Sequence, residues 1–222
     1  MKPKDERIKW QSSLIIGFGD DLPASCPQIN EHTLVICADG GGRWARKWGV
    51  DPHIIIGDLD SLTQQEQAYW KGKKIKFLQF SPEKNETDLE LAVDYCIGLG
   101  ITQMKLVGVW GRRIDHSLGN IEILYRLGQE NIQAEIRTND TQLILVGREL
   151  NCTLIPNTTI SLLPLSPRVT GIHTRGLYYP LIDGTLVKGR TLGISNRVVE
   201  PAVQVKTNQG ILLAIILSGK SI

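Results

Sequence analysis

Short apolar runs alternate with amphipathic helical patterns over the first 147 residues, and this alternation restricts the fold more than any other feature of the chain. Solidly apolar strands separated by helices are typical of a mostly parallel sheet covered by helices on both faces. The expected strands are 14–16, 33–38, 54–56, 75–80 and 104–109. The expected helices are 42–48, 63–71, 88–99 and 115–127. The last helix is predicted to bury Leu118, Ile121 and Leu124, which recur at three-residue spacings.

From about residue 149 the pattern changes to short strands separated by Pro, Gly and Asn, with no helical period. Such a pattern indicates a small antiparallel sandwich. The expected strands are 159–163, 169–173, 185–187, 202–207 and 211–217. Asp183-Gly184 and Asn208-Gln209-Gly210 are expected to form hairpin turns. We therefore predict an α/β domain over residues 1–147 and an all-β sandwich domain over residues 148–222.

Composition excludes several classes of protein. Lysine and arginine total 25 against 23 acidic residues, which is far from the concentrated positive charge of a nucleic-acid-binding protein. No run of about 18 apolar residues could span a membrane, and residues 1–10 lack the features of a signal peptide. The four cysteines are scattered without a C-x-x-C pair, which argues against zinc or a disulfide framework. Cys37 and Cys96 are expected to be core thiols in a cytoplasmic protein.

Ligands of open parallel sheets bind beyond the carboxyl ends of the strands. The segment Asp39-Gly40-Gly41-Gly42 follows the strand 33–38. Its glycines would let the backbone approach a phosphate, and the next helix would offer free N–H groups. No Gly-Lys-Ser/Thr follows, so this is not a Walker phosphate loop. A tight turn with a helix cap explains the segment equally well.

Asp58 and Asp60 follow the strand 54–56 at a spacing that lets both carboxylates face one hard cation. Mg²⁺ in phosphoryl transfer takes one or two carboxylates together with phosphate oxygens. A helix cap before Leu62 is the alternative. The functional interpretation is favoured because two carboxylates crowded after a buried strand repel each other unless a cation is near. Glu86-Thr87-Asp88, taken alone, is an ordinary N-cap with an acid in the first helical turn.

The segment Gly108 to His116 follows the strand 104–109 and opens the next helix. Arg112 and Arg113 would be well placed there to clamp phosphates with paired hydrogen bonds. Asp115 could also be a helix cap and His116 a partly buried side chain. Together, the strand ends provide groups for a cation and for phosphates, without a Walker motif or a Ser or Cys nucleophile system.

These segments together resemble the thiamine pyrophosphokinase (thiamine diphosphokinase) family. The matching segments, in the family's order, are 38–41, 56–61, 86–88, 111–116, 176–181 and 192–196. The resemblance implies a nucleotide-binding catalytic domain followed by a thiamine-binding β domain. It also implies a homodimer, with thiamine held where the catalytic domain of one subunit meets the β domain of the other. The implied reaction is the Mg²⁺-dependent transfer of diphosphate from ATP to thiamine, giving AMP and thiamine diphosphate.

The resemblance also assigns roles to residues. The implied metal ligands are Asp58, Asp60 and Asp88. The implied ATP-binding residues are Asp39, Gly40, Gly41, Thr87, Arg112, Arg113 and His116. The implied thiamine-facing residues are Ser195, Asn196 and Tyr179. Catalysis is expected to rest on Asp58, Asp60, Asp88, Arg113 and Asp115.

We hypothesise direct attack of the thiamine hydroxyl on the β-phosphorus, with Asp88 or Asp115 taking the proton. The chain departs from the family pattern at Arg43, Asn85, Arg112 and Arg197, and three of these changes add or preserve positive character near the expected phosphates. The departures leave the acceptor open, so another small alcohol such as a hydroxymethylpterin is an alternative. A Mg²⁺-dependent phosphatase using a covalent aspartate and a non-catalytic nucleotide sensor are further alternatives.

Overall fold

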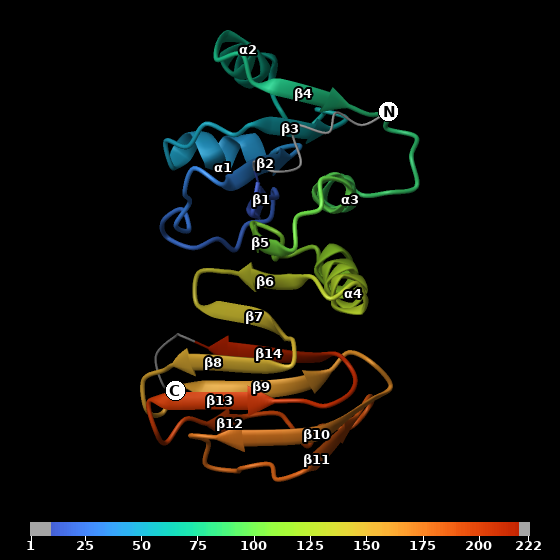
Figure 1. Cartoon of the computed structure of the whole chain (residues 1–222). Coiled ribbons are helices and arrows are strands. Elements are labelled where there is room, and N and C mark those ends of the chain that lie inside the picture. Colours follow the sequence, from blue (N-terminus) through green and yellow to red (C-terminus); the bar gives the residue numbers. More distant parts are fainter. Residues whose placement is uncertain (1–9, 218–222) are drawn as a thin grey trace. The chain divides into compact units, whose positions relative to one another are not determined.

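The structure is a computed structural model that describes residues 10–217 (Figure 1). The described residues divide into two compact units, one of residues 10–123 with 137–139, the other of residues 124–136 with 140–217. The first unit is α/β and the second is β-rich, which confirms the predicted fold class. The second unit also includes residues that precede 147. The compact units do not test where the catalytic region ends and the thiamine-binding region begins, so the boundary at residue 147 stays a prediction.

The strands of the first unit lie in the order β5-β1-β2-β3-β4, and each neighbouring pair is parallel. Its strands are β1 (Ser12–Ile16), β2 (Thr33–Ala38), β3 (Ile54–Gly57), β4 (Lys76–Gln79) and β5 (Gln103–Val107). All five predicted strands are confirmed to within a few residues. The chain runs from β1 outward to β4 and then returns to the other side of β1. The loops after β1 and β5 therefore diverge, and this topological switch point is where such sheets bind ligands.

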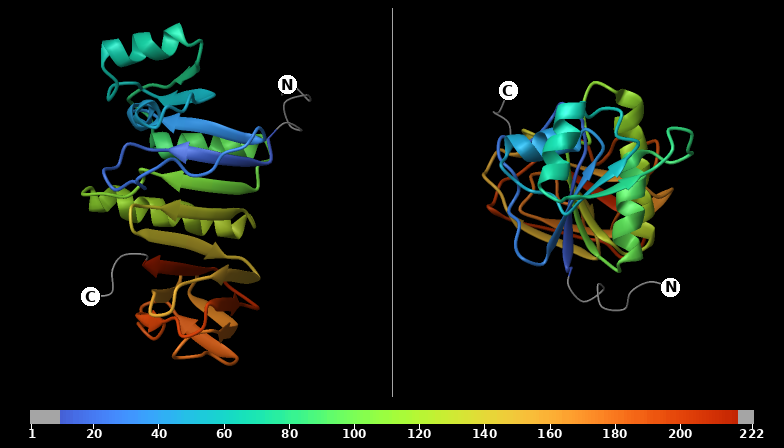
Figure 2. Two further views of the ribbon diagram at one scale, coloured as in Figure 1. Left: turned by 90° about the vertical axis from the view of Figure 1, so that its left-hand side faces the viewer. Right: turned by 90° about the horizontal axis from the view of Figure 1, so that it is seen from above.

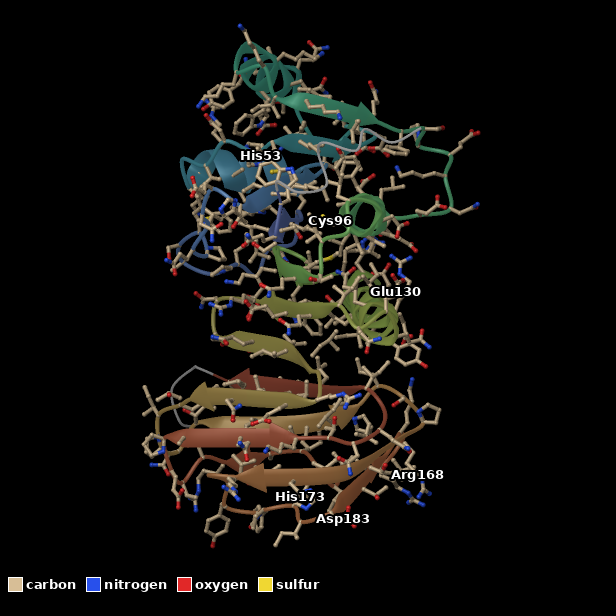
Figure 3. The ribbon with its side chains drawn as sticks, viewed as in Figure 1. His53, Cys96, Glu130, Arg168, His173 and Asp183 are labelled. Carbon is tan, nitrogen blue, oxygen red and sulfur yellow. The ribbon has the colours of Figure 1, made fainter. Side chains whose placement is uncertain are left out.

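Four helices follow strands of this sheet or lead back to it. They are α1 (Gly41–Lys47), α2 (Gln64–Gly72), α3 (Asp88–Gly98) and α4 (Ile114–Gln129). Helices α1 and α2 lie on one face of the sheet and α3 on the other, so the central strands are buried on both faces (Figures 1 and 2). Cys96 on α3 (labelled in Figure 3) and Cys37 on β2 are fully buried, which confirms the prediction of core thiols.

The buried stripe of α4 differs from the prediction. Leu118 is 60% exposed, whereas Leu124 is fully buried. The N-terminal part of the stripe consists of polar residues instead: the Ser117 hydroxyl lies 3.3 Å from the Gly111 N–H, and Asn120 donates to the Val109 carbonyl. Apolar periodicity missed these positions because the helix begins against a loop with polar backbone groups to satisfy.

The second unit contains two sheets whose apolar faces enclose one core. In one of them the strands of this unit have the order β12-β9-β14-β7-β6, and the other is a four-stranded sheet in the order β11-β10-β13-β8. The strands are β6 (Gln133–Arg137), β7 (Thr141–Val146), β8 (Glu149–Thr153), β9 (Thr159–Pro164), β10 (Arg168–Arg175), β11 (Gly184–Val187), β12 (Asn196–Arg197), β13 (Ala202–Lys206) and β14 (Leu212–Leu217). The five predicted strands are confirmed, and β6, β7, β8 and β12 were not predicted.

The hairpin prediction at Asn208-Gln209-Gly210 is wrong, whereas Asp183-Gly184 lies in the connection between two strands that do pair antiparallel. Asp183-Gly184 ends a longer connection between β10 and β11, in which the Asp183 N–H donates to Nε2 of His173 at 3.2 Å (Figure 3). Asn208-Gln209-Gly210 leads from β13 in one sheet to β14 in the other. Turn residues mark a change of chain direction, but they do not show whether the flanking strands pair with each other. Within residues 10–217, no helix is long and apolar enough to cross a bilayer.

Candidate active site

A cavity of about 690 Å³ opens at the carboxyl ends of the strands in the first unit. This volume is typical of a small-molecule binding site. The loops after β1, β2, β3 and β5 and the first turns of α3 and α4 surround it. Its polar and charged lining residues include Asp20, Asp39, Asp58, Asp60, Ser61, Thr87, Asp88, Arg112, Arg113 and His116. The cavity therefore brings together the acidic and the basic strand-end residues singled out in the sequence.

Asp39 stands at the end of β2 with a left-handed backbone (φ 43°), which costs a non-glycine residue about 1 kcal/mol or more. Its N–H donates to the carbonyl of Ile56 at 2.8 Å, which fixes the turn. The side chain is only 6% exposed, and its Oδ1 has no hydrogen-bond partner among residues 10–217. A buried carboxylate oxygen without a partner is costly, so this atom points to a ligand that completes the site.

Asp58 and Asp60 flank Leu59, which is buried and also has a left-handed backbone (φ 70°). This kink folds the chain so that the Asp60 N–H donates to Oδ1 of Asp58 at 3.2 Å. One carboxylate oxygen each of Asp39, Asp58 and Asp60 lies within 4.8 Å of the other two. These three carboxylates form one cluster at the ends of two neighbouring strands.

Two side chains from the helices hold this loop in place. Nε2 of Gln67 on α2 donates to the carbonyls of Leu59 and Leu62 at 3.0 and 3.1 Å. Arg43 on α1 donates to the Ser61 carbonyl at 2.8 Å, and its Nε lies 2.7 Å from the Glu66 carboxylate. Arg43 does not line the cavity. Its guanidinium group therefore holds this loop in place instead of contacting the expected phosphates.

Asp88 approaches the cluster from the first turn of α3. Gly57 makes this approach possible: its φ of 145° suits glycine, and a Cβ there would lie 2.9 Å from the Asp88 carboxylate and 3.1 Å from the Cβ of Asp39. Lys84, in the loop between β4 and α3, places its ammonium 3.0 Å from Asp88 and 3.4 Å from Asp58. The side chain of Lys84 is only 13% exposed, so the two carboxylates are its main partners in place of water.

Burial is the main cause of the raised pKa of Asp39. The charges of Asp60 and Asp58 act in the same direction, while donors at Ser61 and Gly40 act against it. A raised pKa means that the protein environment disfavours the ionised form of this carboxyl group. A cation bound to the cluster would reverse that preference.

Asp88 and Asp58 respond differently to the same surroundings. Burial raises the pKa of Asp88, against the opposing effect of Lys84. Burial acts on Asp58 in the same sense, but the Asp60 N–H and the Lys84 ammonium outweigh it, so the pKa of Asp58 is lowered. Burial works against the charge of Lys84 too, yet Asp88 and Asp58 together raise the pKa of Lys84. The lysine therefore stays positively charged behind the carboxylates.

The arginines of the loop after β5 lie at the exposed rim of the cavity, and each is paired. Nε of Arg112 lies 2.6 Å from Asp20, and its backbone N–H donates to the same carboxylate. Arg113 binds both oxygens of Asp115, with the shortest distance at 2.6 Å, and thereby lowers the pKa of Asp115. Arg113 and His116 line the same cavity as the acidic cluster.

Gly40 and Gly41 lie beside the cavity rather than on its lining. A Cβ at Gly40 would strike the ring of Phe18, and one at Gly41 would strike the carbonyl of Ile16. These glycines let α1 begin close to the end of β1, which is a steric role.

The predicted thiamine-facing residues gather in the second unit. The Asn196 side chain accepts from the Tyr179 N–H at 3.0 Å and donates to the Tyr179 carbonyl at 2.7 Å. Ser195 has a left-handed backbone (φ 58°), and its N–H donates to the Ser161 hydroxyl. The Tyr179 ring is exposed and packs edge-on against Tyr178. Asn196 thus joins two loops, and the side chains of Ser195 and Tyr179 remain accessible.

Sequence reasoning missed several residues of the site. Lys84 and Gln67 were not considered, although Lys84 precedes Asp88 by four residues, a spacing at which opposite charges often pair. Phe18 and Asp20 follow β1, and the signal for them was a Gly-Phe-Gly-Asp segment at a strand end.

The fold and the site define an open α/β protein whose acidic crevice, rimmed by arginines, suits a metal-bound polyphosphate. Residues 27–136 match the family model described as "Thiamin pyrophosphokinase, catalytic domain", and residues 146–212 match "Thiamin pyrophosphokinase, vitamin B1 binding domain". The chain belongs to the thiamine pyrophosphokinase family.

Individual relatives agree with this family. The thiamine pyrophosphokinase of Bacillus subtilis is 32% identical over 197 residues, which cover 87% of this chain and 92% of the relative. A crystal structure of thiamine pyrophosphokinase from the same organism superposes with a TM-score of 0.85 at 28% identity, covering 94% of this chain and all of the other. The thiamin pyrophosphokinase structure from Geobacillus thermodenitrificans gives a TM-score of 0.81 at 25% identity, covering 95% of this chain and 99% of the other.

Proposed function

We propose that this protein transfers diphosphate from ATP to the hydroxyl group of thiamine, giving thiamine diphosphate and AMP with Mg²⁺ as the metal. The observation that carries the proposal is the convergence of Asp39, Asp58 and Asp60 within 4.8 Å in one cavity, in a member of this family. The family supports neither a pterin diphosphokinase nor a phosphatase. The cytoplasmic location stays a prediction.

The residues of the cluster fit a magnesium ion. Mg²⁺ prefers carboxylate oxygens and phosphate oxygens, and the cluster offers carboxylates alone. Oδ1 of Asp39, which has no hydrogen-bond partner in the described part of the chain, is a buried acceptor that a cation would satisfy. We assign Asp39, Asp58 and Asp60 as the metal-holding residues, so Asp39 replaces Asp88 in the ligand set that the family resemblance implied.

The chain's own residues would act mainly by positioning groups and neutralising charge, as is usual in phosphoryl transfer. Bound Mg²⁺ supplies charge neutralisation at the phosphate oxygens and orients the nucleotide. Arg113, and Arg112 beside it, bind the phosphates at the rim after exchanging their carboxylate partners for phosphate oxygens. The bond from the thiamine oxygen to the β-phosphorus forms as the bond from the β-phosphorus to the oxygen bridging the α-phosphate breaks.

The hydroxyl proton of thiamine must pass to a base. Both oxygens of Asp115 are bound by Arg113, which lowers the pKa of Asp115 and weakens it as a base. Asp88 lies within the cavity, and burial raises its pKa. We therefore assign Asp88 as the base that accepts the hydroxyl proton of thiamine.

We assign thiamine to the loops of the second unit that carry Ser195, Asn196 and Tyr179. The exposed Tyr179 ring offers an aromatic face to the cationic thiazolium ring. The left-handed backbone at Ser195 presents its side chain from a turn that Ser161 fixes. A homodimer that completes the thiamine site is part of the proposal.

The direct test is incubation of the protein with ATP, Mg²⁺ and thiamine, followed by chromatography for AMP and thiamine diphosphate. Asp60→Asn should lower turnover at least a hundredfold, since loss of a group close to the metal costs about that much or more. The exposed acid Glu83 provides the matched control, and Glu83→Gln should turn over like the wild type. Near-normal AMP release by Asp60→Asn would refute the metal assignment.

A further inference from the structure

Lys84 is placed unusually for a lysine. Its ammonium lies 3.0 Å from Asp88 and 3.4 Å from Asp58, and its side chain is 13% exposed. Lysines are rarely this buried unless they are paired. Lys84 does not belong to the cavity lining, whereas both of its carboxylate partners do. It therefore contacts the cluster from behind, away from the space that a substrate would fill.

The position of Lys84 matters because of the charge in front of it. Asp39, Asp58, Asp60 and Asp88 carry up to four negative charges in one cavity. Lys84 is the cation in direct contact with two of them, while the two arginines of the rim are engaged with Asp20 and Asp115. A unit charge a few ångströms from the carboxylates changes their attraction for a divalent ion by far more than a surface charge does.

We propose that Lys84 is a positioning residue that acts as the internal counter-ion of the acidic cluster and weakens the binding of a divalent cation in the absence of nucleotide. The proposal rests on the metal site assigned above. Lys84 holds Asp58 and Asp88 in place while the cavity contains no cation. Because it also lowers the negative charge of the cluster, the cation is bound firmly only when the phosphates of ATP add their own oxygen ligands.

This role makes a prediction opposite in sign to that of a merely structural lysine. Lys84→Met removes the charge and keeps most of the side-chain volume. If Lys84 is the counter-ion, Lys84→Met should bind Mn²⁺ without nucleotide at least about tenfold more tightly than the wild type, which corresponds to about 1.4 kcal/mol. If Lys84 only orders the loop, its loss should scatter the carboxylates and weaken Mn²⁺ binding.

The measurement is titration of the full-length protein with Mn²⁺, following free Mn²⁺ by electron paramagnetic resonance. Lys84→Arg keeps the charge and should stay within about threefold of the wild-type affinity. Lys73→Met is the matched control, because it removes a lysine that pairs with Asp51 outside the cavity, and it should leave Mn²⁺ affinity unchanged. In turnover assays, Lys84→Met should raise the KM for the Mg²⁺–ATP complex, because the cluster then repels the phosphates more strongly, and Lys84→Arg should restore it.

Thermal unfolding of each variant shows that it is folded, and Lys84→Gln replaces Lys84→Met if the latter does not fold. Unchanged or weaker Mn²⁺ binding by the uncharged variant overturns the proposal while leaving the metal site standing. No Mn²⁺ binding by either the wild type or the uncharged variant overturns the metal site as well. Tighter Mn²⁺ binding by the uncharged variant than by the wild type supports both the counter-ion role of Lys84 and the metal site.

Discussion

Asp39 is proposed to be needed for activity, yet its carboxylate charge should destabilise the metal-free protein. Asp39→Asn keeps the shape of the side chain and removes one charge from the cluster. At 4.8 Å and an effective dielectric constant of about 20, two carboxylates repel each other by about 3.5 kcal/mol. The net effect on stability is smaller than this repulsion, because Lys84 partly neutralises Asp58 and because Asp60 is exposed to screening by solvent. We expect the metal-free variant to be more stable by about 2 kcal/mol, and inactive.

For a chain of this length, about 2 kcal/mol corresponds to an increase in Tm of about 4–8 °C. Calorimetry in EDTA at pH 7 measures the change. Added Mg²⁺ should narrow or reverse the difference, because it binds the wild-type cluster better than the variant. Glu83→Gln should leave the Tm nearly unchanged, as expected for an exposed site.

The pH dependence provides a second check on Asp39. Its pKa is raised in the folded protein above the ordinary value of 3.8, so folding disfavours the ionised form. The penalty is fully present above the folded pKa, shrinks as the pH falls through it and is absent below 3.8. The stability gain of Asp39→Asn should shrink over the same interval. A metal-free variant no more stable than the wild type at pH 7 would refute the electrostatic argument.

Three further changes test other parts of the structure. Gly57→Ala places a Cβ 2.9 Å from the Asp88 carboxylate at a φ of 145°, so urea unfolding should show a loss of about 1–3 kcal/mol and AMP release should fall at least tenfold. Arg43→Met removes the partner of Glu66, and since Arg43 is partly exposed the cost should be about 1 kcal/mol at pH 7. Arg43 lowers the pKa of Glu66 to about 2, so this stabilisation is complete above 4.5 and is lost as the pH falls through about 2; unfolding curves across that range should converge. Asn196→Ala should raise the KM for thiamine at least tenfold and leave the KM for ATP within about twofold, as steady-state kinetics would show; equal rises in both would contradict a separate thiamine site.

The parallel sheet was predictable because its central strands β1, β2 and β3 carry continuous apolar runs and are followed by turn residues. Strands such as β8 were missed because half of their side chains are exposed, as in the segment 149–153. The short strand β12 consists of two polar residues, and it exists only because it pairs with β9. Patterns of burial reveal a strand with two buried faces more readily than an edge strand with one.

The acidic residues of the site were predictable because parallel strands end at a common edge, so sequence-distant loops must meet there. The partners of those residues were not predictable in the same way. Lys84 lies on a loop, and its side chain is directed by two carboxylates from other elements. Arg112 was expected to face phosphates, yet it binds Asp20, which is 92 residues away in the chain. Such ion pairs follow from the folded geometry rather than from local spacing.

The pairing of β7 with β14 limits how this protein can be dissected. The two strands pair residue for residue from Thr141 to Val146, although one precedes residue 147 and the other ends the described chain. A fragment truncated after residue 147 would leave the apolar strand β7 without this neighbour, and the complementary fragment would expose β14 along one edge. Unpaired apolar edges of this kind promote aggregation. Separate expression of the two halves should therefore give insoluble material, and mixing them would require the strands to find each other before they associate with copies of themselves.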